Sequence, residues 1–219
     1  HRDLHSFPTR RSSDLMVVDE FGSGFPAAWC LSSHEHTTAM TVFFDIIKHN
    51  TGTITPEWFM SDTANQYYNA WVGVMGHRPK KLLCLWHVDK AWRENIKEKV
   101  TISSHKKDHS AKGEDSATED MIGPKVYKML RTVLEETSEA TFSDLLEKML
   151  QVLEENAATS SFCKYFVSEW VPRAREWAFC YRRELGITTN MYVEAFHRTF
   201  KHNYCTRRES STNEWKHAS

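Results

Sequence analysis

Residues 58–86, WFMSDTANQYYNAWVGVMGHRPKKLLCLW, decide the class of fold. Trp58–Ser61 is a short apolar run that predicts a buried strand, and Asp62 follows it. Thr63–Met75 predicts a helix, because its apolar residues recur at helical spacing. Lys81–Trp86 predicts the next strand. Strands that alternate with helices in this way are typical of an α/β protein.

Toward the N-terminus, two apolar runs flank a glycine-containing turn. Met16–Glu20 and Phe25–Leu31 are separated by FGSG, which predicts a β-hairpin. Pro26 cannot donate to a ladder hydrogen bond, so we expect it at a strand start or an edge. Thr37–His49 then predicts an amphipathic helix with an N-cap at Thr37 or Thr38. Its expected buried face consists of Met40, Phe43, Phe44 and Ile47.

Toward the C-terminus, the pattern becomes helical. His87–Val100 predicts a helix with Val88, Ala91, Trp92 and Ile96 inward. Residues 103–120 are polar and without period, which favours a loop or linker. Two apolar faces and an aromatic-rich stretch follow: Val126, Leu130, Val133 and Leu134; Phe142, Leu145, Leu146, Met149, Leu150 and Leu153; and Phe162–Trp177. A last helix is expected over Asn190–Tyr204. The whole order predicts an α/β sheet with a helical insertion.

Composition excludes several classes of protein. The 219 residues are 40% hydrophobic and 26% charged, as in ordinary globular proteins. We find no apolar run near the ~18 residues of a membrane helix and no secretory signal. Five cysteines without a repeated spacing do not indicate a disulfide framework, which favours a reducing compartment. The formal net charge of −1 gives no support for DNA contact.

His1–Leu15, HRDLHSFPTRRSSDL, is an Arg/Ser-rich arm without period. One interpretation is a disordered or basic targeting leader. We favour another, because the arm resembles the conceptual translation of a sequencing-library adapter. The natural polypeptide is then expected to begin near Met16 in this chain, with its upstream segment missing, and the arm is excluded from the predicted fold.

Asp62 is the first candidate for a functional side chain. It stands at the C-terminal end of a predicted strand, where ligands gather in α/β sheets. A carboxylate there can reach a shared pocket. The alternative is an N-cap for the following helix, a position that Asp favours, and position alone does not separate the two.

Glu194 belongs to a polar stripe on the expected last helix. Asn190, Glu194, His197 and Lys201 recur at i, i+4, i+7 and i+11, on one helix face. A carboxylate with neighbouring amide, imidazole and ammonium groups suits metal and phosphate chemistry. The alternative is a solvated helix face with a Glu194–His197 pair.

Cys84 and His87 form a C-x-x-H pair at a strand-to-helix junction. A closed zinc site usually has four ligands, and we find no second ligand pair, so such a site is not expected. The alternative is a buried Cys followed by a locally bonded His. Asp19 and Glu20 could pass for a catalytic pair, but we favour a role in the solubility of the hairpin turn.

Four blocks occur in the order of one known family: VVDEFGSGFPAAWCLSSHEHT, PEWFMSDTANQYYNAW, KKLLCLWHVDKAWRENI and TTNMYVEAFHRTFKHNY. Together they closely resemble the transposase domains of Mutator-like elements (MULEs), over roughly residues 16–208. The resemblance implies an RNase H-like fold with an all-helical insertion before the last catalytic helix. It also implies three acidic residues that hold two divalent ions, Mg²⁺ or Mn²⁺, for phosphodiester chemistry.

By motif, Asp62 matches the second acid of the family and Glu194 the third, so both are expected as catalytic metal ligands. Cys84 and His87 match the family's supporting C-x-x-H. Asn190, His197 and Lys201 are candidates for phosphate or DNA contact. The first acid is expected on an opening strand upstream of Met16, and Asp19 does not replace it. The fold is therefore expected to be incomplete, and this chain to be inactive as it stands.

The resemblance implies a nuclear protein whose full-length form cuts and joins DNA. Its expected partner is DNA at the transposon ends. The resemblance also allows for a homo-oligomer and predicts no membrane contact. Alternatives are a domesticated DNA-binding regulator, such as the far-red-impaired-response transcription factors, or a decayed element without function. The expected organisation is an arm over 1–15, a first segment of the RNase H-like core over 16–102, a linker over 103–120, a helical insertion over 121–186, the final core helix over 187–205 and a tail over 206–219.

Overall fold

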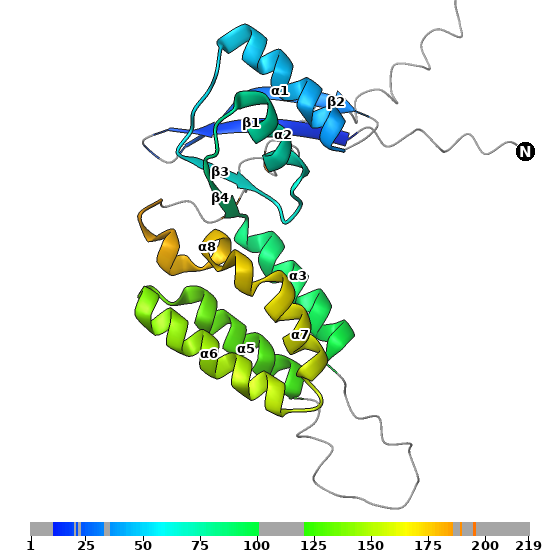
Figure 1. The fold of residues 1–219 in the computed structure, drawn as a ribbon, viewed down its shortest axis with the longest axis vertical. Helices are drawn as coiled ribbons and strands as arrows, with labels where there is room; N and C mark the ends of the chain where they lie inside the picture. The colour runs from blue at the N-terminus through cyan, green and yellow to red at the C-terminus, as the bar shows by residue number, and fades with distance from the viewer. Residues whose placement is uncertain are drawn as a thin grey trace, which may run out of the picture. The chain divides into compact units, whose positions relative to one another are not determined.

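The computed structural model describes residues 11–19, 21, 23–32, 36–100, 121–185, 189 and 195. The chain divides into two compact units (Figure 1). Unit 1 comprises His1–Phe59, Ala64–Pro79 and Asn190–Ser219, and unit 2 comprises Met60–Thr63 and Lys80–Thr189. The fold is mixed α/β and mostly helical, and the strands of the described residues pair in two small two-stranded sheets.

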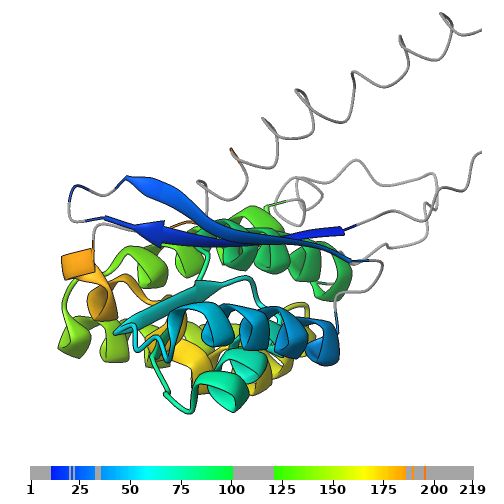
Figure 2. The same ribbon diagram turned by 90° about the horizontal axis from the view of Figure 1, so that it is seen from above.

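The hairpin of unit 1 consists of β1 (Arg11–Val18) and β2 (Gly24–Ser32), which run antiparallel (Figure 2). Leu15 pairs with Ala28 and Met16 with Pro26, so β2 carries one extra residue at this point. Such a bulge leaves a ladder position open, which accommodates the missing N–H of Pro26.

The start of β1 corrects the sequence prediction. The strand begins at Arg11, so residues 11–15 of the excluded arm belong to it. Ser13 is buried and its hydroxyl lies 3.4 Å from that of Tyr67, while Leu15 packs against the core of unit 1. Alternate residues of the arm therefore face the core, a period that the polar composition of the arm concealed.

The helices of unit 1 pack face to face. α1 (Thr37–Thr51) buries the four predicted residues, which confirms its buried face. The predicted N-cap at Thr37 or Thr38 is wrong: the N-cap is His36, whose Nδ1 accepts a hydrogen bond from the Ala39 amide at 3.3 Å. α2 (Gln66–Met75) begins three residues later than predicted and buries Ala70, Trp71 and Met75. Phe44 of α1 meets Trp71 of α2 edge to face, with ring centroids 5.2 Å apart.

Two short strands introduce unit 2. β3 (Trp58–Ser61) has the predicted bounds and pairs with β4 (Lys80–Leu83). β4 ends three residues before the predicted Trp86, and α3 (Leu85–Lys99) begins at once. The prediction placed the boundary between strand and helix too late. Leu82 and Leu83 are buried as strand residues, whereas Trp86 is exposed on the first turn of α3.

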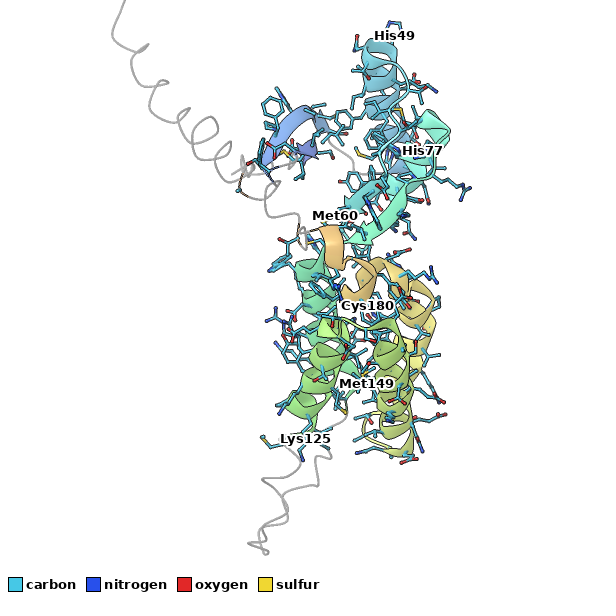
Figure 3. The ribbon with its side chains drawn as sticks, turned by 90° about the vertical axis from the view of Figure 1, so that its left-hand side faces the viewer. His49, Met60, His77, Lys125, Met149 and Cys180 are labelled. Carbon is cyan, nitrogen blue, oxygen red and sulfur yellow. The ribbon has the colours of Figure 1, made fainter. Side chains whose placement is uncertain are left out.

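Four helices form the body of unit 2. α3 packs against α5 (Ile122–Glu135) and α7 (Ser160–Glu169), and α6 (Glu139–Glu155) packs against α5 and α7; the predicted apolar faces of α5 and α6 point inward. Met149, labelled in Figure 3, lies in this core on α6. Trp92 of α3 stands at its centre, with the ring of Trp177 at 5.2 Å. The rings of Phe166 and Trp170 both lie 5.6 Å from Trp92.

The aromatic-rich helical stretch expected over Phe162–Trp177 is a continuous helix only at its start. α7 ends at Glu169, and short turns follow: η1 (Val171–Arg173), α8 (Ala174–Trp177), η2 (Phe179–Tyr181) and η3 (Arg183–Leu185). Pro172 lies in η1 and lacks the N–H that a continuous helix would need. The break returns Trp177 to the core, where its indole N–H donates to the Trp170 carbonyl at 2.9 Å.

In the part of the chain that the structure describes, no helix is long and apolar enough to cross a membrane.

Candidate functional site

Asp62 and Cys84 lie at the ends of the two paired strands. Asp62 directly follows β3 and is half-buried, and Cys84 directly follows β4 and is fully buried. The Cys84 amide donates to the Ser61 carbonyl at 2.9 Å, so the two strand ends are held side by side. Two residues that are 22 positions apart along the chain therefore lie on adjoining backbone within unit 2.

His87 lies on the first turn of α3, close to these strand ends. Cys84 is the N-cap of the helix, so the C-x-x-H pair spans the helix start as the sequence suggested. The His87 ring meets Trp86 edge to face at 4.7 Å between centroids. The other predicted site residues, Asn190, Glu194, His197 and Lys201, lie outside the described residues.

A charged network links α8 to the same strand ends. The Lys81 ammonium of β4 lies 3.6 Å from the Glu176 carboxylate, and its side chain is only 8% exposed. Arg173 donates from Nε to Glu176 at 3.0 Å and from Nη2 to the Thr63 carbonyl at 3.2 Å. The segment after Asp62 is thus fastened to a helix more than a hundred residues away in sequence.

The electrostatic environment of Lys81 includes Asp62. Burial lowers the pKa of the Lys81 ammonium, and the carboxylates of Glu176 and Asp62 act in the opposite direction. Asp62 is therefore near enough to Lys81 for their charges to interact.

Arg182 is a buried cation next to Cys84. Its side chain is 2% exposed, and Nη1 donates to the Leu83 carbonyl at 2.9 Å. Burial lowers the pKa of Arg182 to about 10, so the guanidinium keeps its charge at neutral pH. Its Nε and Nη2 are buried and have no hydrogen-bond partner among the described residues. A buried charge whose side chain has one carbonyl as its hydrogen-bond partner among the described residues is costly to bury.

Within the described residues, no three His, Cys, Asp or Glu side chains come together in a group that could hold a metal ion. Asp62 carries a carboxylate, the type of oxygen donor that Mg²⁺ and Mn²⁺ prefer, but in the described part of the chain no second such donor joins it in a group of this kind.

Sequence reasoning missed Arg173, Glu176 and Arg182. They come from the short turns after α7, about a hundred residues from the strands that they contact. No spacing rule connects segments so far apart, so the sequence held no signal for these members of the site. Lys81 was within a predicted strand, but its ion-pair partner Glu176 comes from α8.

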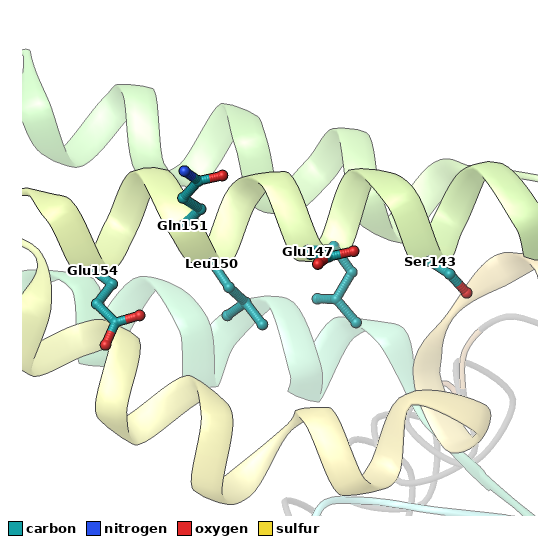
Figure 4. Close-up of a pocket in the computed structure, with 6 residues that line it drawn as sticks. Ser143, Glu147, Leu150, Gln151 and Glu154 are labelled. Carbon is teal, nitrogen blue, oxygen red and sulfur yellow. The ribbon is translucent and has the colours of Figure 1, made fainter.

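Two other features are not candidate sites. The Asp19 carboxylate accepts from the Phe21 and Ser23 amides at 3.0 and 2.7 Å, so it stabilises the hairpin turn; Glu20 lies outside the described residues. A shallow groove on unit 2 is lined by residues of α6 alone (Figure 4): Ser143, Leu146, Glu147, Leu150, Gln151 and Glu154. Side chains from a single helix face do not converge on a ligand as those of a binding pocket do.

Comparison with protein-family models, with curated proteins and with solved structures found no match to this chain.

Proposed function

We propose that this chain belongs to the catalytic domain of a MULE-type DNA transposase with an RNase H-like fold. In the full-length form, Asp62 and Glu194 would bind Mg²⁺ or Mn²⁺ and promote cleavage and joining of DNA. The resemblance of four ordered sequence blocks is the origin of the proposal. Nuclear localisation and transposon ends as the partner belong to it as well.

One structural observation supports the proposal more than any other. The hydrogen bond from the Cys84 amide to the Ser61 carbonyl brings the strand end with Asp62 next to the strand end with the C-x-x-H pair. Ligands of α/β proteins bind at such carboxyl ends of strands. The element order also agrees, since β1, β2, α1, β3, α2, β4 and α3 precede the helical segment α5–α8.

The test needs the protein extended by its upstream sequence. The ends of the source transcript are sequenced first, since the proposal expects a strand with an additional Asp before Met16. The extended protein is then assayed for Mn²⁺-dependent cleavage of DNA that carries the element's ends. Asp62→Ala and Glu194→Ala should each abolish cleavage, because each removes a metal ligand.

Asp144→Ala is the matched control, because Asp144 is an exposed carboxylate on α6 that pairs with Lys148. It should retain cleavage. If Asp62→Ala cleaves like the unchanged protein, the proposal is wrong. If the upstream strand carries no Asp, the domesticated DNA-binding regulator becomes the better hypothesis.

A further inference from the structure

Arg173 is held in a fixed direction by its neighbours on the short turns after α7. It is the last residue of η1, and its amide donates to the Trp170 carbonyl at 3.1 Å. Its guanidinium lies 5.9 Å from the centroid of the Trp170 ring, and its Nε donates to the Glu176 carboxylate at 3.0 Å. Because the guanidinium is planar, these contacts also fix the direction in which its other donors point.

A second donor of the same guanidinium holds the Thr63 carbonyl. Arg173 Nη2 lies 3.2 Å from this oxygen, across 110 positions of the chain, and both residues belong to unit 2. Asp62 and Thr63 lie between the end of β3 and the start of α2, outside regular secondary structure. Main-chain groups in such a segment are satisfied by bonds from elsewhere in the chain, so a side-chain donor can fix its position.

Asp62 lies between two carbonyl groups that are both held. On one side, the Ser61 carbonyl accepts from the Cys84 amide at 2.9 Å, and on the other, the Thr63 carbonyl accepts from Arg173. Because peptide units are planar, rotation about the backbone of Asp62 would move one of these carbonyls relative to the other. The two bonds therefore limit the directions in which the Asp62 carboxylate can point.

Glu176 connects this arrangement to β4. Its carboxylate accepts from Arg173 and lies 3.6 Å from the Lys81 ammonium. The side chains of Lys81, Arg173 and Glu176 are 8%, 21% and 25% exposed, so solvent screens their charges less than those of surface pairs. Glu176 thus keeps Arg173 beside the paired strands β3 and β4.

We propose that Arg173, held by Glu176, is a positioning residue for Asp62. Its bond to the Thr63 carbonyl keeps the Asp62 carboxylate in one direction, so the turns after α7 determine the geometry of a side chain more than a hundred residues away. The catalytic consequence rests on the proposed function, in which Asp62 is a catalytic residue, whereas the effect on the position of the segment does not.

Hydrogen exchange of the full chain, followed by mass spectrometry, tests the position of the segment. Arg173→Gln removes the charged donor to the Thr63 carbonyl, so exchange in peptides that cover residues 60–66 should become about tenfold faster. Arg173→Lys keeps the charge but not the planar arrangement of donors, and should loosen the same peptides. Arg175→Gln is the matched control, because Arg175 is exposed on α8 and lies 5.3 Å from the centroid of the Tyr181 ring instead. Protection in α5 and α6 should stay unchanged in all three variants.

The catalytic consequence is tested in the extended protein, assayed for Mn²⁺-dependent cleavage of DNA that carries the element's ends. Arg173→Gln should lower the single-turnover rate constant at saturating protein by roughly tenfold to a hundredfold, because a misplaced catalytic group slows the chemical step. The protein concentration for half-maximal rate should stay unchanged, because binding of DNA is not affected. A loss of folded protein alone would not change this rate constant.

A positioning role is excluded if Arg173→Gln exchanges over residues 60–66 like the unchanged chain, if Arg175→Gln has the same effect, or if exchange rises equally in α5 and α6. Unchanged protection in Arg173→Lys would show that charge alone suffices, and a change in half-maximal concentration alone would make Arg173 a DNA contact; both contradict the role. If the unchanged extended protein does not cleave DNA, the proposed function fails and hydrogen exchange alone decides the position of the segment. If Arg173→Gln cleaves at the unchanged rate, the proposed function stands and the positioning role is wrong.

Discussion

At the scale of single residues, Asp89 shows how much one buried carboxylate can organise. It is 8% exposed on α3 and accepts a hydrogen bond from the Tyr127 hydroxyl of α5 at 2.6 Å. Arg93 lies 2.5 Å from one of its oxygens, and Arg131 lies 3.7 Å from the other. Asp89 thus joins two helices of unit 2, although no pattern in the sequence distinguished it.

Asp89→Asn should lower the free energy of unfolding by about 1–3 kcal/mol, because the two arginines lose their anion while solvent screens some of the effect. Urea unfolding measures the change. Asp144→Asn, which breaks the exposed Lys148 pair, should change stability by less than about 0.5 kcal/mol. Equal effects of the two substitutions would show that burial of Asp89 contributes nothing.

The titration of Tyr127 gives a second test of this contact. The hydrogen bond to Asp89, followed by burial, raises the pKa of Tyr127 above its ordinary value. The pKa of Tyr127 is therefore higher in the folded protein than in the unfolded one. The protonated Tyr127 hydroxyl then contributes to stability fully below the unfolded pKa, and this contribution is lost as the pH rises through the folded pKa. Asp89→Asn should lower the pKa of Tyr127, as measured by tyrosinate absorbance with Tyr127→Phe subtracted. An unchanged titration would contradict the assignment.

At the scale of elements, the two glycines of α2 have opposite roles. Gly76 ends the helix with φ of 71°, in the left-handed region. Gly73 lies inside the helix, and a Cβ there would meet nothing within 4 Å. Alanine is therefore expected to be strained at one position and favourable at the other.

Gly76→Ala should destabilise unit 1 by about 1 kcal/mol, and Gly73→Ala should stabilise it by about 0.5–1 kcal/mol. The thermal midpoints of the two variants should move in opposite directions from that of the unchanged chain. A common direction would mean that α2 does not end at Gly76 as described.

At the scale of the whole molecule, each unit has its own core. Trp92 is fully buried among the rings of unit 2, and Phe44 is buried against Trp71 in unit 1. Trp92→Ala and Phe44→Ala should each cost about 3–5 kcal/mol through loss of burial and the cavity left behind.

Hydrogen exchange followed by mass spectrometry should locate the two effects. Trp92→Ala should reduce protection in α5, α6 and α7 while α1 and α2 keep theirs, and Phe44→Ala should do the reverse. Loss of protection throughout the chain in both variants would show that the two cores unfold as one.

The sequence by itself determined the local elements and their faces. The periods of apolar residues located α1, α5 and α6 and named their buried side chains, because burial on one face requires a fixed spacing. The sequence also located Asp62 at a strand end and the Cys84–His87 pair at a strand-to-helix junction, positions that depend only on residues close in sequence.

Only the tertiary structure decided which distant residues meet those strand ends. Lys81 pairs with Glu176 of α8, and Arg182 reaches the Leu83 carbonyl across 99 positions. The break of the helix at Pro172 brings Arg173 and Glu176 to the site. Contacts between segments so far apart depend on the packing of whole helices around Trp92. No spacing along the chain encodes that packing, because it is a property of all the buried side chains together.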